Sequence, residues 1–309
     1  MYPISPQLAA FIAKTESFIS DDSSLASLRQ NYDRMCRAFT PPRPEGLLIE
    51  DFCIGGVGVR SYQPAGPAPA EEWPCLLYMH GGGWAVGGLD SHDFICFELA
   101  TALHVLVIAI DYRLAPEHPF PAAYEDCRAV WQAIQSGEAP YRISLQRLAV
   151  VGDSAGGNLA AALCLGLRDD GQPLPCVQVL IYPGLGSPAD LPSRRDCRDA
   201  PLLSTDDADY YSGLYLQGAG KPSAYAMPLL AEDLRRLPNA LVVVAQFDPL
   251  RDDGMLYAER LQAAGVNAVL YPGKGLIHGC LRARGQVPEV DRLYDYLLQF
   301  LRREVLTQV

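Results

Sequence analysis

The sequence has few basic residues, no long hydrophobic run and no paired-cysteine motif. Its 25 Lys and Arg residues are outnumbered by 36 Asp and Glu residues, which gives a formal net charge of −11. Nucleic acids and anionic membrane surfaces bind clusters of Lys and Arg, so this charge argues against both as partners. No apolar run reaches the ~18 residues of a membrane span, and the first residues lack the basic region of a secretory signal. We therefore expect no stable membrane association.

The nine cysteines are scattered from Cys36 to Cys280 without a C-x-x-C pair. An odd number without such spacing fits neither a disulfide framework nor a zinc site. Reduced thiols are typical of intracellular proteins, so we expect a cytoplasmic location. Asp90, His92 and Asp93 do not predict a metal site either, because ligands on adjacent residues cannot all face one ion.

Apolar segments of two kinds alternate along the chain. Alternating polarity between residues 47 and 62 predicts strand structure. Short continuous apolar runs predict buried strands at 75–80, 104–112, 147–152, 177–183, 240–248 and 268–273. Amphipathic stretches predict helices at 94–103, 122–136, 158–167, 254–264 and 290–303. Such strands separated by helices indicate an α/β fold, with a mostly parallel central sheet and helices on both faces.

Two segments do not follow this alternation. Residues 6–40 begin with helix-spaced apolar positions and continue as a charged, loosely patterned stretch, and residues 184–227 form a polar insertion. The insertion is either a lid or an elaborate surface loop. We favour a single domain, 1–309, with a helical cap and a catalytic core. The cap is expected at 1–45 and 184–227, and the core at 46–183 and 228–309.

A serine between two glycines follows one of the predicted strands. Residues 152–156 read GDSAG, and a helical pattern starts directly after them. A G-x-S-x-G sequence between a strand and a helix predicts a nucleophile elbow, a strained turn that requires glycine two residues before and after the serine. The helix N-terminus favours negative charge at the same place. We expect Ser154 to be a nucleophile; a tight strand–helix packing turn is the alternative.

A serine hydroxyl acts as a nucleophile near neutral pH only when a base accepts its proton. The base in turn needs a carboxylate that orients it and stabilises its charged form. Of the five histidines, His278 follows the last core strand, where a doubly wound sheet exposes residues at its carboxyl edge. Asp248 ends a predicted strand at the same edge. Asp252 and Asp253 instead read as charges at the start of the next helix. We therefore expect Ser154, His278 and Asp248 to form a catalytic triad.

Three consecutive glycines follow the strand predicted at 75–80, in the sequence HGGGW. Glycines let backbone N–H groups turn toward a ligand without obstruction by a Cβ atom. A phosphate-binding loop is the rival interpretation, but the Gly-Lys-Ser/Thr of a P-loop is absent. We expect the N–H groups of Gly82, Gly83 and Ala155 to form an oxyanion hole.

The motifs HGGGW, DYRLAPEHPFPAA, GDSAGGNLAA and DPLRDDG are followed by a His-Gly pair at 278–279. With these motifs, from about residue 73 to its end, the chain resembles the hormone-sensitive-lipase-like family of α/β-hydrolases, particularly its bacterial carboxylesterases and acetyl esterases. The order Ser, Asp, His is also that of α/β-hydrolases. The resemblance implies an α/β-hydrolase fold with a helical cap and no cofactor. The chain departs from the family at Cys280, where a bulky aromatic residue is usual.

The resemblance implies a serine carboxylesterase that hydrolyses short- to medium-chain acyl esters through an acyl-enzyme intermediate, with a small-molecule ester as its partner. An amidase, peptidase or lactonase on the same fold is an alternative, as is a non-catalytic relative that binds a small molecule or a protein. We expect Trp84, Asp153, Tyr182 and Tyr215 to line the substrate pocket. The tyrosines of the insertion fit lid packing equally well. A homodimer is left open.

Overall fold

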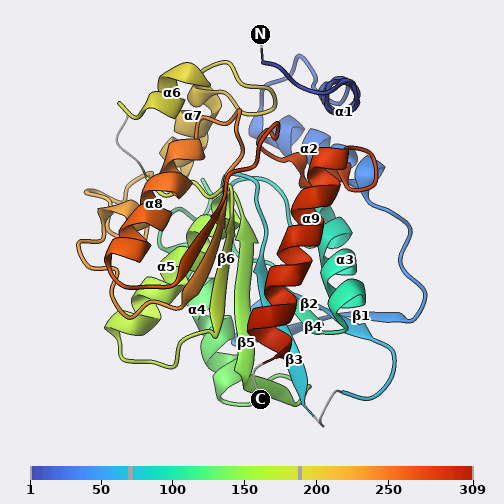
Figure 1. The fold of residues 1–309 in the computed structure, drawn as a ribbon, viewed down its shortest axis with the longest axis vertical. Helices are drawn as coiled ribbons and strands as arrows, with labels where there is room; N and C mark the ends of the chain where they lie inside the picture. The colour runs from blue at the N-terminus through green and yellow to red at the C-terminus, as the bar shows by residue number, and fades with distance from the viewer. Residues whose placement is uncertain (1, 69–71, 187–189, 308–309) are drawn as a thin grey trace.

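An eight-stranded sheet forms the centre of the molecule in the computed structural model, which describes residues 2–68, 72–186 and 190–307 (Figure 1). Its strand order is β1-β2-β4-β3-β5-β6-β7-β8. The strands are β1 (Leu47–Ile54), β2 (Val57–Pro64), β3 (Trp73–Met79), β4 (Leu106–Ile110), β5 (Ile143–Asp153), β6 (Val177–Ile181), β7 (Asn239–Val243) and β8 (Ala268–Tyr271). Strands β1, β2 and β4 pair antiparallel, and all other pairs are parallel. The predicted α/β class with a mostly parallel sheet is confirmed.

Helices cover both faces of the sheet. They are α3 (Asp93–Leu103) and α9 (Pro288–Leu301) on one face, and α4 (Ala122–Gln135), α5 (Ala155–Asp169) and α8 (Arg251–Ala263) on the other. Alternate side chains of a strand point to opposite faces. In β3, Leu77 therefore packs in the core beneath α4 and α5, while Leu76 and Tyr78 pack in the core beneath α3 and α9. Both faces are apolar, which explains the continuous apolar runs in the sequence.

Two local expectations need correction, and one is refined. Strand β7 ends at Val243, so Asp248 follows it in a loop and does not end a strand. His104 does not open a strand; it closes α3 in the left-handed conformation, with φ 54°. The strand structure expected at 47–62 is present, as a hairpin of two strands, because Gly55 and Gly56 turn the chain with positive φ. Hydrophobic runs alone do not locate such turns.

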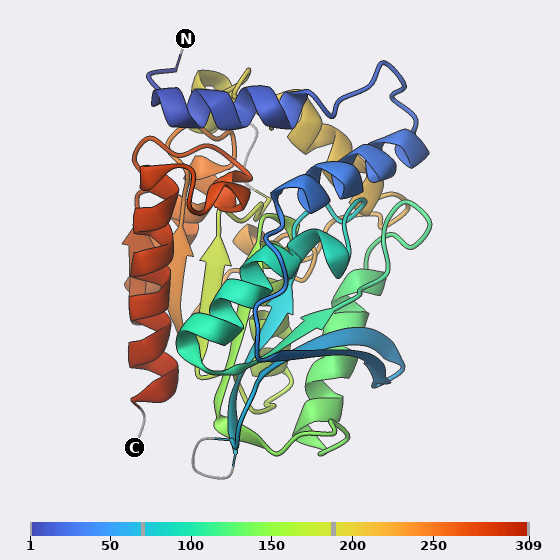
Figure 2. The same ribbon diagram turned by 90° about the vertical axis from the view of Figure 1, so that its right-hand side faces the viewer.

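Four further helices lie above the carboxyl ends of the parallel strands (Figures 1 and 2). These covering helices are α1 (Pro6–Glu16), α2 (Leu25–Phe39), α6 (Pro192–Asp196) and α7 (Thr205–Tyr215). Short turns complete the chain: η2 (Asp90–His92), η3 (Pro228–Leu230), η4 (Cys280–Ala283) and η5 (Arg302–Leu306). Of the insertion expected at 184–227, residues 187–189 lie outside the described residues. In the described ranges, no helix combines the length and the apolar character that crossing a membrane requires.

Candidate active site

The site lies where the direction of the chain across the sheet reverses. From β3 the chain passes to β4 on one side, and it then returns to β5 on the other side of β3. The loops that follow β3 and β5 therefore diverge, and ligands of open α/β sheets bind in the crevice between such loops. The glycine loop that begins at Gly81 follows β3, and Ser154 follows β5. Topology thus brings together two motifs that are about 70 residues apart in the sequence.

Ser154 occupies a strained turn between β5 and α5, with φ 53° and ψ −118°. A Cβ atom at Gly152 would lie 2.2 Å from the carbonyl oxygen of Gly156. A Cβ atom at Gly156 would lie 1.9 Å from the carbonyl oxygen of Met79. Both glycines are therefore required sterically. The turn also places Ser154 at the N-terminus of α5, where the helix dipole favours negative charge.

The three residues expected to form a triad are hydrogen-bonded in series. The Nε2 atom of His278 is 2.9 Å from Oγ of Ser154, and its Nδ1 atom is 2.7 Å from Oδ2 of Asp248. Asp248 is fully buried, and its other carboxylate oxygen accepts a hydrogen bond from the backbone N–H of Leu250. A backbone bridge between Phe247 and Ile277 aligns the loops that carry Asp248 and His278. The geometry suits proton transfer from the serine to the histidine.

The glycine loop lies beside the serine. Gly82 and Gly83 have φ values of 124° and 57°, and a Cβ atom at Gly82 would lie 2.1 Å from the carbonyl oxygen of Val86. The ring of Tyr211, from α7, packs so closely over Gly83 that a Cβ atom there would lie 2.4 Å from it. Gly82, Gly83 and Ala155 line the same cavity as Ser154. Their backbone is thus free of side-chain obstruction at the site.

A buried hydrogen-bond network holds this loop against the elbow. Oδ1 of Asp153 accepts hydrogen bonds from Tyr78 Oη at 2.7 Å and from the Gly81 N–H at 2.9 Å, and it lies 3.4 Å from Nε2 of His92. Burial raises the pKa of Asp153, but the interactions with His92 and Tyr78 outweigh burial and lower this pKa to about 2. The carboxylate is therefore ionised at neutral pH. The sequence pattern did not reveal the roles of Tyr78 and His92.

His80, the residue before the glycine loop, is expected to make the stability of the protein depend on pH in mildly acidic solution. Burial, followed by repulsion from His92, lowers the pKa of His80 to about 3. The unfolded chain has a His pKa near 6.5 and so binds more protons below that pH. The His80 contribution to stability is complete above pH 6.5 and is lost as the pH falls toward 3. We expect the free energy of unfolding to decrease between pH 6.5 and 5.5 by up to ~1.4 kcal/mol per pH unit from this residue.

Urea denaturation at pH 7.0, 6.5, 6.0 and 5.5 measures this slope, and His80→Asn, which carries no titrating group there, is expected to flatten it. Equal slopes in the two proteins would contradict the prediction. If the variant does not fold, ¹⁵N NMR of the wild type gives the answer, because the His80 ring is expected to stay neutral throughout this range.

A cavity of about 800 Å³ opens above Ser154 and His278. Such a volume is typical of small-molecule sites. Of the pocket residues expected from the sequence, Trp84 and Asp153 line it. Tyr182 and Tyr215 lie outside its lining in the described chain: Tyr182 packs against the His278 ring with centroids 4.7 Å apart, and Tyr215 stacks on Trp84 with centroids 4.3 Å apart. Helix α2 adds the apolar side chains of Leu28 and Met35, and the segments that follow α1, α6 and α7 add Phe18, Leu202 and Leu216.

Comparison with known proteins shows the family of this chain. A family model described as an alpha/beta hydrolase fold matches residues 76–282. The chain belongs to the α/β-hydrolase family. Esterase LipI of Mycobacterium tuberculosis is 38% identical, over 97% of this chain and 94% of its own length. Ethyl acetate hydrolase of Pseudomonas putida is 34% identical, over 98% of this chain and 99% of its own.

A solved esterase from the bacterial hormone-sensitive lipase family has a TM-score of 0.89 to this chain. It shares 29% sequence identity and covers 98% of this chain and 100% of its own. The crystal structure titled DphMB1 has a TM-score of 0.88 and 37% identity, covering 98% of this chain and 100% of its own. The family resemblance inferred from the motifs is confirmed.

In this α/β-hydrolase, two polar side chains attach the insertion to the core. The buried amide of Asn158, one turn into α5, donates hydrogen bonds to the carbonyl oxygens of Gly184 and Ala226, near the two ends of the insertion. Asp253 accepts a hydrogen bond from the Leu185 N–H. The sequence suggested only helix-start charge for Asp253 and no role for Asn158.

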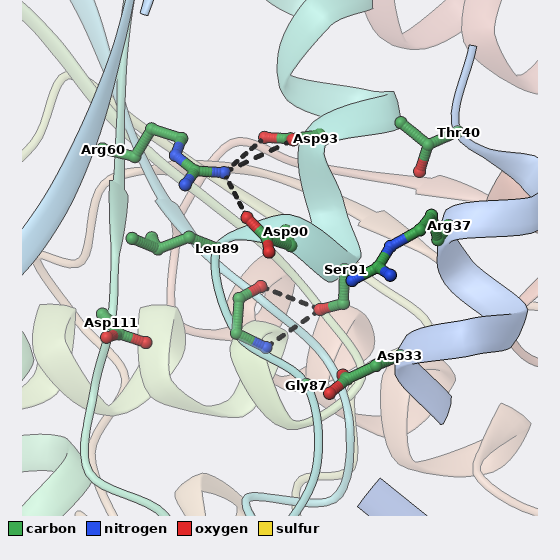
Figure 3. Close-up of a pocket in the computed structure, with 11 residues that line it drawn as sticks. Asp33, Arg37, Thr40, Arg60, Gly87, Leu89, Asp90, Ser91, Asp93 and Asp111 are labelled. Atoms are coloured by element: carbon green, nitrogen blue, oxygen red, sulfur yellow. Dashed lines mark hydrogen bonds and ion pairs between the residues drawn. The ribbon is translucent and has the colours of Figure 1, made fainter. Parts of the chain in front are cut away.

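A second, smaller cavity of about 390 Å³ lies between α2, β2 and η2 (Figure 3). Arg60 forms ion pairs with Asp90 at 2.7 Å and with Asp93 at 3.2 Å. The Ser91 hydroxyl donates to the carbonyl oxygen of Gly88 and accepts from its N–H. Asp90 and Asp93 thus share one partner, Arg60, whereas Ser91 is hydrogen-bonded to the backbone of Gly88. In the described ranges, neither Ser154 nor His278 lines this cavity.

Proposed function

We propose that this α/β-hydrolase is a serine carboxylic ester hydrolase. The observation that carries the proposal is the hydrogen-bonded series Ser154, His278, Asp248 beneath the large cavity, with distances of 2.9 and 2.7 Å. The esterase names of its relatives, at 34–38% identity over nearly the whole chain, support the same reaction.

In the proposed mechanism, Ser154 Oγ attacks the ester carbonyl carbon while Nε2 of His278 accepts the serine proton. Asp248 accepts a hydrogen bond from Nδ1 of His278 and stabilises the imidazolium that forms. The tetrahedral intermediate collapses, and the alcohol leaves with the proton from His278. Water, deprotonated by the same histidine, then hydrolyses the acyl-enzyme and releases the carboxylic acid and the free serine.

We propose that the N–H groups of Gly82, Gly83 and Ala155 bind the carbonyl oxygen as it becomes negatively charged. The support for this assignment is the positive φ of both glycines, the unobstructed backbone beside Ser154 and the position of Ala155 as the first residue of α5. Donors fixed before the reaction stabilise the transition state more than the ground state, because they need no reorganisation when charge develops.

We also propose that the covering helices form a cap over the core, and that the cavity beneath them accepts short- to medium-chain acyl groups. The cavity volume of about 800 Å³ and its apolar lining support this range. A cytoplasmic location is proposed from the acidic composition and from the nine cysteines, which all lie in the described ranges as free thiols.

The test is a series of p-nitrophenyl esters with two to sixteen acyl carbons, combined with labelling by a fluorophosphonate. We expect kcat/KM to peak among short or medium chains, and mass spectrometry to find the phosphonyl group on Ser154. A folded protein that hydrolyses none of the esters but still reacts with the probe would favour an amidase or peptidase. Neither hydrolysis nor labelling would favour a non-catalytic binding protein.

A further inference from the structure

A buried arginine without a hydrogen-bonding partner lies in the wall of the large cavity. Arg282, on η4, is only four residues after His278, and 8% of its surface is exposed. In the part of the chain that the structure describes, its guanidinium makes no hydrogen bond or ion pair, and its Nε is buried without a partner. A guanidinium carries five N–H donors and stays protonated. Leaving such a charge buried and unpaired is strongly unfavourable.

The guanidinium lies against the loop that carries His278. A Cβ atom at Gly279, the residue after His278, would lie 3.2 Å from Nη2 of Arg282. On its other side, the Tyr32 ring of α2 lies 5.9 Å from the guanidinium carbon. This ring contact stabilises the charge but satisfies none of its N–H donors. The arginine is thus held between the loop of the catalytic histidine and a covering helix.

Among the described residues, no carboxylate forms a hydrogen bond or ion pair with this arginine. Burial raises the pKa of Cys36 to about 11 and the pKa of Tyr32 well above its usual value, so both are uncharged at neutral pH. The carboxylate of Asp153 attracts Arg282 without a direct hydrogen bond or ion pair in the described chain, and its Oδ1 accepts hydrogen bonds from Tyr78 and Gly81. Arg282 therefore keeps both its charge and its hydrogen-bonding capacity.

The other acidic side chains of the described cavity lining have partners elsewhere, and one of them, Asp253, accepts a hydrogen bond from the Leu185 N–H. Asp22 accepts from Ser24, and Asp207 caps α7 through Ser204. Asp209 pairs with Arg194, which also lines the cavity. The remaining cation in the described lining, Lys221, is exposed. Arg282 is thus a buried cation in the cavity lining whose N–H donors have no partner in the described chain.

We propose that Arg282 binds a carboxylate of the substrate, so that the preferred esters carry a free carboxylate in addition to the ester group. This inference rests on the proposed esterase function and specifies its substrate class. A planar carboxylate matches the guanidinium fork and supplies the missing acceptors. The cavity has room for a linker between the carboxylate and the ester carbonyl above Ser154.

Two pairs of esters test the proposal, one for each side of the ester bond. Monoethyl adipate is compared with ethyl 6-oxoheptanoate, and 4-acetoxybutanoate with 5-acetoxypentan-2-one. In each pair a methyl ketone replaces the carboxylate at equal length, and hydrolysis is followed by pH-stat titration. In at least one pair we expect Arg282→Met to lower the ratio of kcat/KM for the charged ester over the neutral ester by about 10- to 100-fold, mainly through KM.

Arg282→Lys keeps the positive charge but lacks the planar, forked guanidinium. Its ratio of kcat/KM for the charged ester over the neutral ester is expected to lie between those of the wild type and Arg282→Met. Arg235→Met is the matched control, because it removes one positive charge from an exposed ion pair with Asp233; its ratio should equal that of the wild type. Ratios that do not change in Arg282→Met for either pair would overturn the proposal and leave Arg282 a purely structural contact of Tyr32.

If Arg282→Met does not fold, the proposal is tested by comparing inhibition of the wild type and of Arg282→Lys. Free adipate should then inhibit hydrolysis of the neutral esters competitively, and several-fold more weakly in Arg282→Lys; no inhibition of the wild type refutes the proposal. The neutral esters distinguish a failure of the proposed esterase function from a failure of the proposed role of Arg282. If none of the four esters is hydrolysed, the proposed esterase function fails, whereas hydrolysis without a charge-dependent ratio refutes only the role of Arg282.

Discussion

Ser154→Ala is expected to lower kcat for short-chain p-nitrophenyl esters by about 10⁶-fold, because removal of the nucleophile of a serine triad eliminates the acyl-enzyme route. The hydroxyl that would be lost lies 2.9 Å from Nε2 of His278. Alanine retains the Cβ atom that the strained turn already accommodates, so the fold should be unchanged. Initial rates at saturating ester, with circular dichroism to verify folding, measure the effect.

The matched control is Ser136→Ala, which removes a hydroxyl at the end of α4, outside the cavity lining. This variant should keep wild-type rates. Activity of Ser154→Ala within 100-fold of the wild type would show that another group attacks the ester, and the proposed mechanism would have to be abandoned.

The second large effect concerns Gly156. Gly156→Ala is expected to lower the free energy of unfolding by about 4 kcal/mol or more, a size of effect that is rare for single substitutions. The new Cβ would lie 1.9 Å from the carbonyl oxygen of Met79 and 2.7 Å from that of His80. Both are backbone atoms at the end of β3, and they cannot move without disturbing the pairing of β3 with β5. Urea denaturation, or loss of soluble expression, reports the effect.

Gly213→Ala provides the comparison. Gly213 is a helical residue of α7, and a Cβ atom there would have no neighbour within 4 Å. Alanine should stabilise the protein by up to about 1 kcal/mol, because it favours the helix over the unfolded chain. A Gly156→Ala protein with the wild-type denaturation midpoint would mean that the elbow and β3 are not packed as described.

Much of the site could be predicted because each part of it follows a strand. Ser154 directly follows a buried run, and the glycine loop follows another, so both were placed at the carboxyl edge from hydrophobic periodicity and turn chemistry. Asp248 was predicted at this edge for a partly incorrect reason, because it was expected to end a strand. Its loop continues alongside residues 273–277 by backbone hydrogen bonds without forming a strand, yet it reaches the same edge.

The sequence could not show which side chains of the insertion line the cavity, because this depends on side-chain packing. Of the four tyrosines of the insertion, at 210, 211, 215 and 225, Tyr215 was expected to line the pocket, with packing within the lid as an equal alternative. Tyr211 lines the cavity over Gly83, whereas Tyr215 is completely buried behind Trp84 and Tyr225 donates a hydrogen bond to Asp169. The different positions of these tyrosines depend on which face of each segment turns toward the core. That orientation is decided by contacts with residues distant in the sequence.

The sequence by itself determined the α/β architecture, the elbow at Ser154 and the order of the triad, because these depend on local periodicity and on glycines at fixed spacing. Only the tertiary structure decided which polar groups meet in the interior. Asp153 meets His92 and Tyr78, Asn158 meets the ends of the insertion, and Arg282 has no acceptor among the described residues. The reason is physical. Burial makes the state of a polar group depend on every neighbour within hydrogen-bonding distance, and those neighbours come from segments that are brought together by folding alone.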